Sequence, residues 1–218
     1  MRYVSLFSGI EAASVAWGPL GWEAVAFAEI EPFPCAVLAK RFPDVPNLGD
    51  VTKIDWEEFK KQYGAVDLVC GGSPCQSFSI AGGREGLDGE SRLMYEYIRA
   101  VQDLRPAWLL WENVPGVFSI DGGRAFGILI DALEELGYGL AWRTLDAQFF
   151  GVAQRRLTPT ECERLQGFPD GWTDIEYRGK PAADGPRYKA LGNSWAVPCA
   201  RWIGERIDMV EGMIKSDG

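Results

Sequence analysis

The chain has 218 residues, of which 47% are hydrophobic and 24% are charged. This length predicts one domain of ordinary size, or one domain with a small appendage, and the composition excludes a disordered chain. No apolar run approaches the roughly 18 residues of a membrane-spanning helix, and the first residues are strand-like, without the layout of a signal peptide. We therefore expect a globular protein with no membrane partner.

The charge and the counts of reactive residues narrow the function further. Acidic residues outnumber lysine and arginine by 31 to 22, a net charge of −9, so nucleic acid is expected to bind only at a local basic patch. The absence of histidine excludes Ser-His-Asp hydrolases, Cys-His proteases and histidine-bound metals, and we expect no metal site. An odd number of cysteines without close pairing argues against a disulfide framework and predicts a reducing, cytoplasmic location. They are Cys35, Cys70, Cys75, Cys162 and Cys199.

From residue 4 to residue 145, short apolar runs alternate with stretches of helical periodicity. The predicted strands are residues 4–7, 24–28, 67–70, 108–111 and 140–145. The predicted helices are residues 11–17, 32–41, 91–104 and 126–136. Such alternation predicts an α/β fold, a mostly parallel sheet with helices on both faces. Ligands bind beyond the carboxyl ends of the strands in such sheets.

The last quarter of the chain has a different pattern. Thr158 and Glu161 form a capping box, and Gly167 ends the helix that follows. Residues 169–187 are rich in Pro, Gly and Asp and are predicted to form a loop, whereas residues 197–214 predict an amphipathic helix.

Ser8 and Gly9 stand between the first predicted strand and the first predicted helix. A glycine there lets a ligand approach the backbone, and the N–H groups at the start of the helix are free to bind it. Glu29 follows at the end of the second strand, the position where nucleoside-binding sheets hold ribose hydroxyls with a carboxylate. The alternative is a tight turn and an unrelated surface glutamate.

Cys75 follows a predicted buried strand and the run Gly71-Gly72-Ser73-Pro74, which places it at the ligand-binding edge of the sheet. A cysteine attacks only as its thiolate, so its pKa of about 8.5 must be lowered or its proton removed during the reaction. The alternative is a buried structural cysteine, which is how we interpret Cys35, Cys70 and Cys199.

Glu112 follows the predicted strand 108–111, with Trp111 beside it. A carboxyl group in apolar surroundings has a raised pKa and can donate a hydrogen bond or a proton at neutral pH. The alternative is a carboxylate that caps a helix or forms a salt bridge. Because Cys75 and Glu112 both emerge at the same edge of the sheet, we expect them to share one pocket.

Six segments occur in the order found in DNA (cytosine-5) methyltransferases, and they spread over residues 3 to about 207. They are Leu6-Phe7-Ser8-Gly9, Pro74-Cys75-Gln76, Glu112-Asn113-Val114, Gln154-Arg155-Arg156, Arg164-Leu165-Gln166-Gly167-Phe168-Pro169 and Gly192-Asn193-Ser194. The chain resembles that family over nearly its whole length. The resemblance implies a Rossmann-like class I S-adenosylmethionine-dependent methyltransferase, which acts on a cytosine flipped out of duplex DNA and releases S-adenosyl-L-homocysteine.

The chemistry that this resemblance implies fits the residue types. Cytosine C5 is a poor nucleophile, and addition of the Cys75 thiolate to C6 would place electron density on C5, which then takes the methyl group. Glu112 would stabilise the charge that develops at N3 of the base. Arg156 matches the first arginine of the family's Gln-x-Arg-x-Arg pattern and is assigned to the same catalytic set. The reaction needs no metal and no histidine.

The resemblance also assigns binding residues. Those that match the family's cofactor site are Phe7, Gly9, Ile10, Glu29, Ile30, Asp50, Val51, Pro74, Leu93, Asn193, Ser194 and Trp195. Those assigned to DNA contact are Gln76, Ser79, Arg84, Arg92 and Gln154. For Arg84 and Arg92, a solvated surface charge is the alternative.

The chain departs from the family pattern in two places. Glu11 stands where the pattern has its second glycine, and a carboxylate there is unfavourable for the cofactor's own carboxylate unless it points away. Arg156 is followed directly by Leu157-Thr158-Pro159, so the target recognition domain is absent. That domain carries the base-edge readout of DNA, and without it we expect weak or sequence-relaxed activity.

We divide the chain into a catalytic and cofactor-binding core (1–156), a remnant of the small-domain region (157–190) and a C-terminal segment that packs back on the core (191–218). The leading hypothesis is a cytosine-5 DNA methyltransferase of the restriction-modification kind. The alternatives are a non-catalytic S-adenosylmethionine-binding module, a split enzyme that needs a recognition subunit or a homodimer, and an RNA cytosine methyltransferase.

Overall fold

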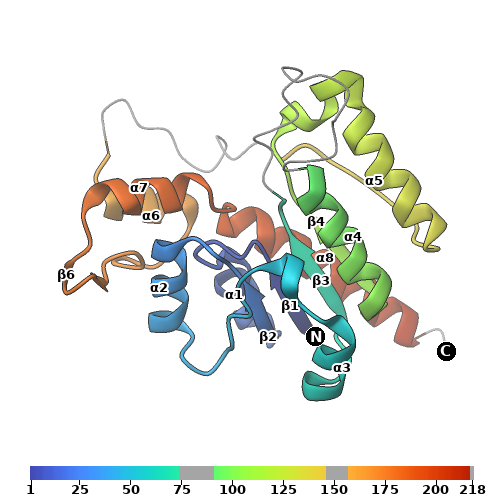
Figure 1. The fold of residues 1–218 in the computed structure, drawn as a ribbon, viewed down its shortest axis with the longest axis horizontal. Coiled ribbons are helices and arrows are strands. Elements are labelled where there is room, and N and C mark those ends of the chain that lie inside the picture. Colours follow the sequence, from blue (N-terminus) through green and yellow to red (C-terminus); the bar gives the residue numbers. More distant parts are fainter. Residues whose placement is uncertain (74–90, 146–156, 217–218) are drawn as a thin grey trace.

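The computed structural model describes residues 1–73, 91–145 and 157–216, and a four-stranded parallel sheet lies at its centre (Figure 1). The strands are β1 (Arg2–Leu6), β2 (Glu23–Ala28), β3 (Leu68–Gly71) and β4 (Trp108–Trp111), in the order β2-β1-β3-β4. The chain first adds β2 to one side of β1 and then β3 and β4 to the other. A sheet of this kind opens a crevice where the direction of strand addition reverses, here between the carboxyl ends of β1 and β3.

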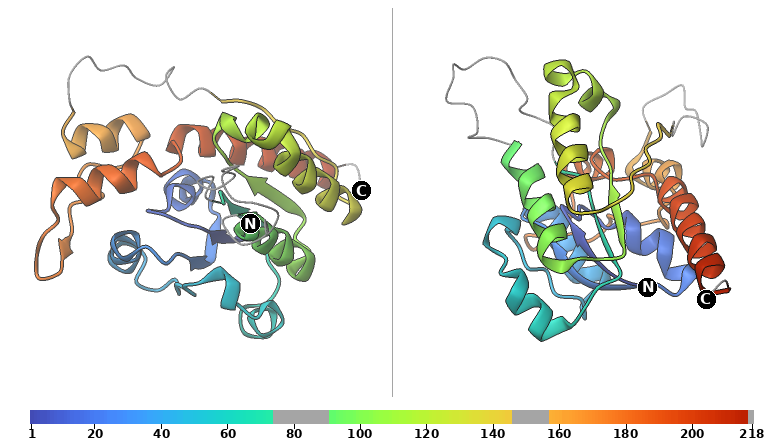
Figure 2. Two further views of the ribbon diagram at one scale, coloured as in Figure 1. Left: turned by 45° about the horizontal axis from the view of Figure 1, so that its top comes forward. Right: turned by 90° about the vertical axis from the view of Figure 1, so that its right-hand side faces the viewer.

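The strands carry two apolar faces, and helices cover both of them. Tyr3 and Cys70 pack in one buried cluster, whereas their neighbours Val4 and Val69 pack in a second, because successive side chains of a strand point to opposite faces. Figure 2 shows α4 and α5 on one side of the sheet and α8 on the other. The helices are α1 (Ala12–Trp17), α2 (Pro32–Arg41), α3 (Trp56–Tyr63), α4 (Ser91–Leu104), α5 (Arg124–Glu135), α6 (Pro159–Gln166), α7 (Asp184–Gly192) and α8 (Val197–Ser216).

Short elements complete the fold. The 3-10 turns are η1 (Gly18–Leu20), η2 (Val51–Lys53), η3 (Pro115–Phe118) and η4 (Ile120–Gly123), and a hairpin joins β5 (Glu176–Tyr177) to β6 (Lys180–Pro181). The predicted α/β fold is confirmed, and the predicted elements at 24–28, 32–41, 91–104 and 108–111 match β2, α2, α4 and β4. None of the helices in the described part of the chain has the length and apolar character needed to cross a membrane.

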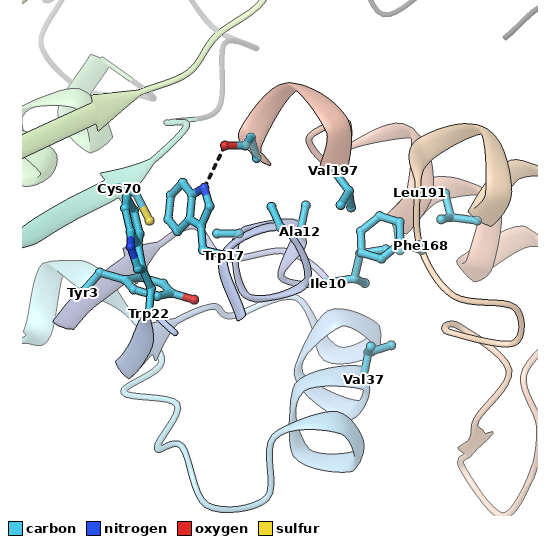
Figure 3. Packing of buried hydrophobic residues seen from close by; sticks show 14 of the residues in the cluster. Tyr3, Ile10, Ala12, Trp17, Trp22, Val37, Cys70, Phe168, Leu191 and Val197 are labelled. Atoms are coloured by element: carbon cyan, nitrogen blue, oxygen red, sulfur yellow. Dashed lines mark hydrogen bonds between the residues drawn. The ribbon is translucent and has the colours of Figure 1, made fainter. Parts of the chain in front are cut away.

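The long C-terminal helix α8 packs on α1, at the other end of the sequence (Figure 3). The Trp17 indole N–H donates to the carbonyl of Ala200 at 2.7 Å, and Trp17 packs edge-on against Tyr3 of β1. A Cβ at Gly204 would lie only 2.6 Å from Cδ1 of Trp17, so a residue without a side chain allows this close approach. The last helix is therefore part of the core that supports β1.

Two sequence predictions are wrong. Residues 140–145 form no strand: Trp142 is 63% exposed and packs edge-on against Phe126 of α5, so the apolar residues of this segment contact a helix instead of joining the sheet. Residues 169–187 are not all loop, since they contain the β5–β6 hairpin and the start of α7. Arg178 and Gly179 both have positive φ, as the tightest hairpin turns require, and such turns share the Gly- and Asp-rich composition of loops.

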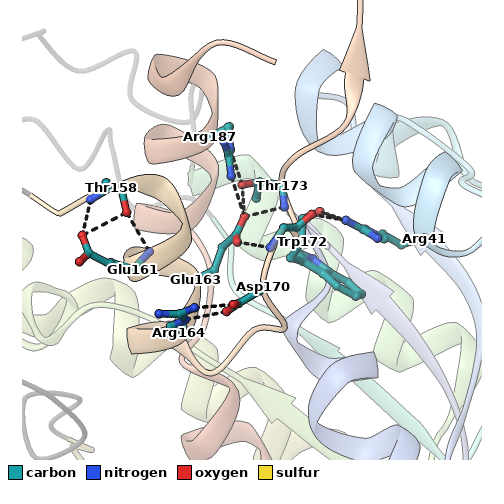
Figure 4. A network of polar contacts seen from close by, with 10 residues as sticks. Arg41, Thr158, Glu161, Glu163, Arg164, Asp170, Trp172, Thr173 and Arg187 are labelled. Atoms are coloured by element: carbon teal, nitrogen blue, oxygen red, sulfur yellow. Dashed lines mark hydrogen bonds and ion pairs between the residues drawn. The ribbon is translucent and has the colours of Figure 1, made fainter. Parts of the chain in front are cut away.

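Helices α6 and α7 are held together by a buried ion pair (Figure 4). The predicted capping box is confirmed, with Thr158 and Glu161 satisfying each other's backbone N–H. Two residues along the helix, the fully buried Glu163 accepts hydrogen bonds from both N–H and Oγ1 of Thr173 and from Arg187, at 2.8, 2.5 and 3.2 Å. Burial alone would raise the pKa of Glu163, but these hydrogen bonds lower it below its usual value.

Candidate functional site

A cleft of about 930 Å³ lies at the carboxyl ends of the strands, where the topology places it. Its walls come from the residues that follow β1, β2, β3 and β4, from α4 and from the end of α7. The predicted cofactor residues that line it are Phe7, Gly9, Glu29, Ile30, Asp50, Val51, Leu93, Asn193 and Ser194. Glu112 lines the same cleft, so the structure brings the predicted catalytic glutamate and the predicted cofactor residues together.

The carboxylate of Glu29 is held in place by backbone N–H groups. Oε2 accepts from Gly9 at 2.8 Å, and Oε1 accepts from Ile30 and Glu31 at 2.8 and 2.7 Å. Hydrogen bonds to an ionised acceptor are short and strong, so this carboxylate is ordered before any ligand binds. The two donors occupy both lone pairs of Oε1, whereas Oε2 keeps one lone pair for a hydroxyl group.

Asn47 fixes the backbone of Glu29 and is a residue that sequence reasoning missed. Its Oδ1 accepts from the N–H of Glu29 and its Nδ2 donates to the carbonyl of Glu29, both at 3.0 Å. The only sequence signal is an amide residue shortly before Asp50, and nothing in the spacing connects it to a strand that ended 19 positions earlier. Asn47 reaches Glu29 because its segment runs beside β2, with an isolated bridge to Phe27.

The outer part of the cleft combines an apolar surface with a capped turn. Ile30 is 67% exposed, an unusual position for an isoleucine on a cleft wall, while Val51 is buried beneath. Asp50 accepts from the hydroxyl and the N–H of Thr52 at 2.8 and 3.1 Å, and these hydrogen bonds lower the pKa of Asp50. This part of the cleft can hold a flat, partly apolar group beside an ionised carboxylate.

Glu112 lines both the cleft and the small cavity that adjoins it, and the residue as a whole is exposed. Burial raises the pKa of Glu112 above its usual value, and a hydrogen bond from Trp195 opposes that shift. A Cβ on Gly72 would lie 2.8 Å from Oε2 of Glu112, so the glycine leaves the space that the carboxyl group occupies. The sequence prediction of a carboxyl group with a raised pKa after β4 agrees with this environment.

Asn113 and Trp111 hold the end of β3. The Asn113 side chain donates to the carbonyl of Ser73 at 3.0 Å, and the Trp111 indole donates to the Ser73 hydroxyl at 3.3 Å. Ser73 is the last described residue before Pro74 and Cys75. Residues from the β4 end thus fix the backbone that leads to the predicted nucleophile.

Glu11 does not project into the cleft as a surface carboxylate. It is the N-cap of α1, is only 1% exposed, and accepts a hydrogen bond from the N–H of Ser14. A second cavity of about 50 Å³ adjoins the cleft and is lined by Glu11, Glu112 and Trp195 among others. Trp195, predicted for the cofactor site, therefore lies at this inner cavity.

Other predicted site residues lie elsewhere or outside the described part. The side chain of Ile10 is fully buried in the core beside α1, and its carbonyl accepts from the Trp172 indole at 3.0 Å, so Ile10 lines neither the cleft nor the small cavity beside it. Arg92 lies in α4, but its side chain is not described. The predicted residues outside the described ranges are Pro74, Cys75, Gln76, Ser79, Arg84, Gln154 and Arg156.

The site thus combines the turn at Gly9, the ordered carboxylate of Glu29 and the carboxyl group of Glu112, whose pKa is raised. A model of the family described as C-5 cytosine-specific DNA methylase matches residues 1–157 and 154–209. The chain belongs to the C-5 cytosine-specific DNA methylase family. The resemblance drawn from the six sequence segments is therefore confirmed.

Curated relatives agree with this family, although one differs in name. The chain is 29% identical to the type II methyltransferase M2.BsuMI of Bacillus subtilis, over 98% of this chain and 77% of the relative. It is 42% identical to a DNA N-6-adenine-methyltransferase of Escherichia phage P1, over 71% of this chain and 27% of that protein. With the orphan methyltransferase M.SPRI of Bacillus phage SPR it shares 37% identity, over 36% of that relative. The chain thus spans only 27% of the length of the phage P1 relative and 36% of the length of M.SPRI.

Solved structures confirm the Rossmann-like methyltransferase fold. The S. pombe Dnmt2 methyltransferase superimposes with a TM-score of 0.65 at 13% identity, covering 96% of this chain and 99% of that one. A putative DNA modification methyltransferase encoded within an E. coli prophage gives a TM-score of 0.53 at 25% identity, over 62% of this chain and 38% of that one.

Proposed function

We propose that this methylase-family chain transfers a methyl group from S-adenosylmethionine to C5 of a cytosine in DNA. The observation that carries the proposal is that one cleft joins the ordered carboxylate of Glu29 to the carboxyl group of Glu112, whose pKa is raised. The first suits a nucleoside ribose, and the second suits a base that must be protonated or hydrogen-bonded as charge develops.

The described residues fit S-adenosylmethionine, which supplies an electrophilic methyl group when bound. Glu29 would accept a ribose hydroxyl at Oε2, because its carboxylate is held by three N–H groups and this oxygen keeps one free lone pair. The exposed Ile30 and the nearby Val51 and Asp50 would hold the adenine ring. The amino-acid portion would lie toward Phe7, Gly9, Leu93, Asn193, Ser194 and Trp195. Ile10 and Pro74, which closes the methyl-donor side, are assigned to the site through the family pattern.

In the proposed reaction, the Cys75 thiolate adds to C6 of the flipped cytosine and forms a C–S bond. The electrons of the C5–C6 double bond move to C5, and charge that reaches N3 is stabilised by a hydrogen bond or proton from Glu112, whose raised pKa keeps the proton available. C5 would then take the methyl group that bound S-adenosylmethionine supplies, and loss of the C5 proton to a base would break the C–S bond and release the Cys75 thiolate. Arg156 is assigned to this catalytic set through the family pattern.

DNA would contact Gln76, Ser79, Arg84, Arg92 and Gln154, and we propose that sequence preference is relaxed. The alignment with M2.BsuMI extends over 305 positions, more than the 218 residues of this chain, so that relative carries long segments opposite gaps in this chain. This supports the division into a core (1–156), a small-domain remnant (157–190) and a returning C-terminal segment (191–218), without a recognition domain. A recognition subunit or a second copy would supply the missing DNA contacts.

Incubation with methyl-labelled S-adenosylmethionine and mixed-sequence duplex DNA, followed by nucleoside analysis, tests the proposal. We expect label in 5-methyldeoxycytidine, and sequencing of the product would give the site preference. Duplex RNA in a parallel reaction tests the RNA alternative. No incorporation with any substrate, but binding of S-adenosylhomocysteine, would instead support a non-catalytic or partner-dependent module.

The name of the phage P1 relative favours a second candidate, transfer to N6 of adenine. Such a reaction needs no cysteine nucleophile, so it would survive replacement of Cys75. Label in N6-methyldeoxyadenosine would support it and overturn the cytosine assignment.

A further inference from the structure

Glu11 is a buried carboxylate that has no basic partner in the described part of the chain. It is only 1% exposed and has a left-handed backbone conformation, with φ 64°, at the start of α1. Among the described residues, no lysine or arginine forms an ion pair with it, and no basic group contributes to its pKa. An uncompensated buried charge is costly, so an arrangement of this kind calls for a cation from elsewhere.

The hydrogen bonds of Glu11 leave one of its carboxylate oxygens, Oε2, able to accept a further donor. Oε1 accepts from the N–H and Oγ of Ser14 at 3.1 and 3.0 Å, and more weakly from the Tyr3 hydroxyl at 3.4 Å. In the described part of the chain, Oε2 accepts only from Ser5, at 2.9 Å. A carboxylate oxygen has two lone pairs, so Oε2 can take a further donor.

A small cavity adjoins Glu11. Glu11 lines the cavity of about 50 Å³, and Phe7, Gly9 and Glu112 line both this cavity and the large cleft. The small cavity is therefore the inner end of the cleft. Its size suits a group about as large as a water molecule or an ammonium ion.

We infer that this inner cavity binds the ammonium group of the cofactor's amino-acid portion, with ionised Glu11 as its charge partner. The inference rests on the proposed function, because it requires the cofactor in the cleft. Glu11 thereby acts as a positioning and recognition residue at a place where the family pattern has glycine. Among the described residues, the side chains that face Glu11 are Tyr3 and Ser5 from β1, Ser14 from α1 and Cys70 from β3, and Glu112 lines the same cavity; none of these is basic.

The charge of Glu11 changes in the neutral range. Burial raises its pKa to about 7, against the opposing hydrogen bonds from Ser5 and Ser14. Protonated Glu11 offers no charge to an ammonium group. Affinity for a ligand that carries the ammonium group therefore falls as the pH drops below 7, whereas a ligand that lacks it has no such dependence.

Calorimetric titration of the full chain with S-adenosylhomocysteine and with 5′-methylthioadenosine, at pH 5.5 and 7.5, tests this. The second ligand shares the adenosine and thioether but lacks the amino-acid portion. We expect the dissociation constant of S-adenosylhomocysteine to rise about tenfold or more at pH 5.5, from the fraction of ionised Glu11, and that of methylthioadenosine to stay constant. In Glu11→Gln and Glu11→Gly the dependence should disappear, and in Glu112→Gln it should remain.

The outcomes separate the two proposals. Three outcomes overturn the inference while leaving cofactor binding intact. They are a pH dependence of methylthioadenosine binding equal to that of S-adenosylhomocysteine, a pH dependence that persists in Glu11→Gln, and a pH dependence that vanishes in Glu112→Gln. No binding of either ligand at any pH overturns both the inference and the proposed cofactor. The wild-type titrations need no variant, and Glu11→Gly suits the positive φ at this position, so a folding defect in Glu11→Gln does not block the test.

Discussion

Gly72 lies directly against the carboxyl group of Glu112, and a Cβ at residue 72 would lie 2.8 Å from both Oε2 and the carbonyl oxygen of Glu112. Because Gly72, after β3, has no side chain, the carboxyl group of Glu112, after β4, can occupy this position. Two residues 40 positions apart act as one unit of the proposed catalytic site.

We predict that Gly72→Ala lowers methyl transfer by about 100-fold, because the displaced carboxyl group no longer reaches the base. Steady-state transfer of labelled methyl groups to DNA measures the effect. Gly127→Ala is the matched control, since nothing lies within 4 Å of a Cβ there. Equal activity of the two variants would show that the position of Glu112 does not matter.

We predict that Cys75→Ser abolishes covalent trapping on DNA that contains 5-fluorocytosine, because the serine hydroxyl is a far weaker nucleophile than a thiolate. Gel electrophoresis under denaturing conditions detects the adduct. Cys162→Ser, in α6, is the control and should trap DNA like the wild type. An undiminished adduct in Cys75→Ser would assign the nucleophile to another residue.

We predict that Asn47→Ala weakens cofactor binding by roughly tenfold, since loss of two hydrogen bonds to the backbone of Glu29 costs on the order of 1–3 kcal/mol. Titration calorimetry with S-adenosylhomocysteine measures the change. The variant leaves the cleft residue Asn193 unchanged, so a weaker affinity would be due to the lost support of Glu29. A dissociation constant equal to that of the wild type would mean that Glu29 does not need this support.

We predict that Glu11 makes the fold less stable as the pH rises. Its folded-state pKa of about 7 lies above the usual 4.5, so the folded protein binds the proton more tightly. Its stabilising contribution is full below pH 4.5 and is lost as the pH rises through 7, by a total of about 3 kcal/mol. Urea unfolding at pH 5 and pH 7.5 should show a larger loss of stability in the wild type than in Glu11→Gln. Equal losses would place the pKa of Glu11 near its usual value.

We predict that Arg187→Met destabilises the protein by about 3–5 kcal/mol, because it leaves the buried Glu163 without its cation. The double variant with Glu163→Gln should recover part of this loss. Thermal unfolding of the single and double variants measures both. A loss below about 1 kcal/mol in Arg187→Met would show that Thr173 and Gly171 satisfy Glu163 on their own.

Local signals in the sequence were sufficient for the four strands of the sheet and for the edge where the candidate site lies, although they also predicted a fifth strand that does not form. The capping box of Thr158 depends on neighbours three residues apart, and strands such as 108–111 are short apolar runs between turn residues. Because parallel strands end at one edge of the sheet, the meeting of Glu29 and Glu112 in one cleft also followed from the order of elements.

The rest depended on contacts between distant segments. The direction of the Glu11 side chain is set by Tyr3, Ser5 and Ser14 together, and the role of Asn47 depends on a bridge to β2. The segment 140–145 has the composition of a strand, but Trp142 packs against a helix. Periodicity reports which side chains are apolar and does not report which surface they meet.

The packing of α8 on α1 has a consequence for biosynthesis. Asn193, Ser194 and Trp195 complete the cleft and its inner cavity, and they are held there by a helix whose Ala200 carbonyl accepts from Trp17. A nascent chain that has released the four strands but not yet α8 has an open half of the cleft and an uncovered Trp17. The proposed cofactor site is therefore complete only after residues beyond Gly204 have left the ribosome.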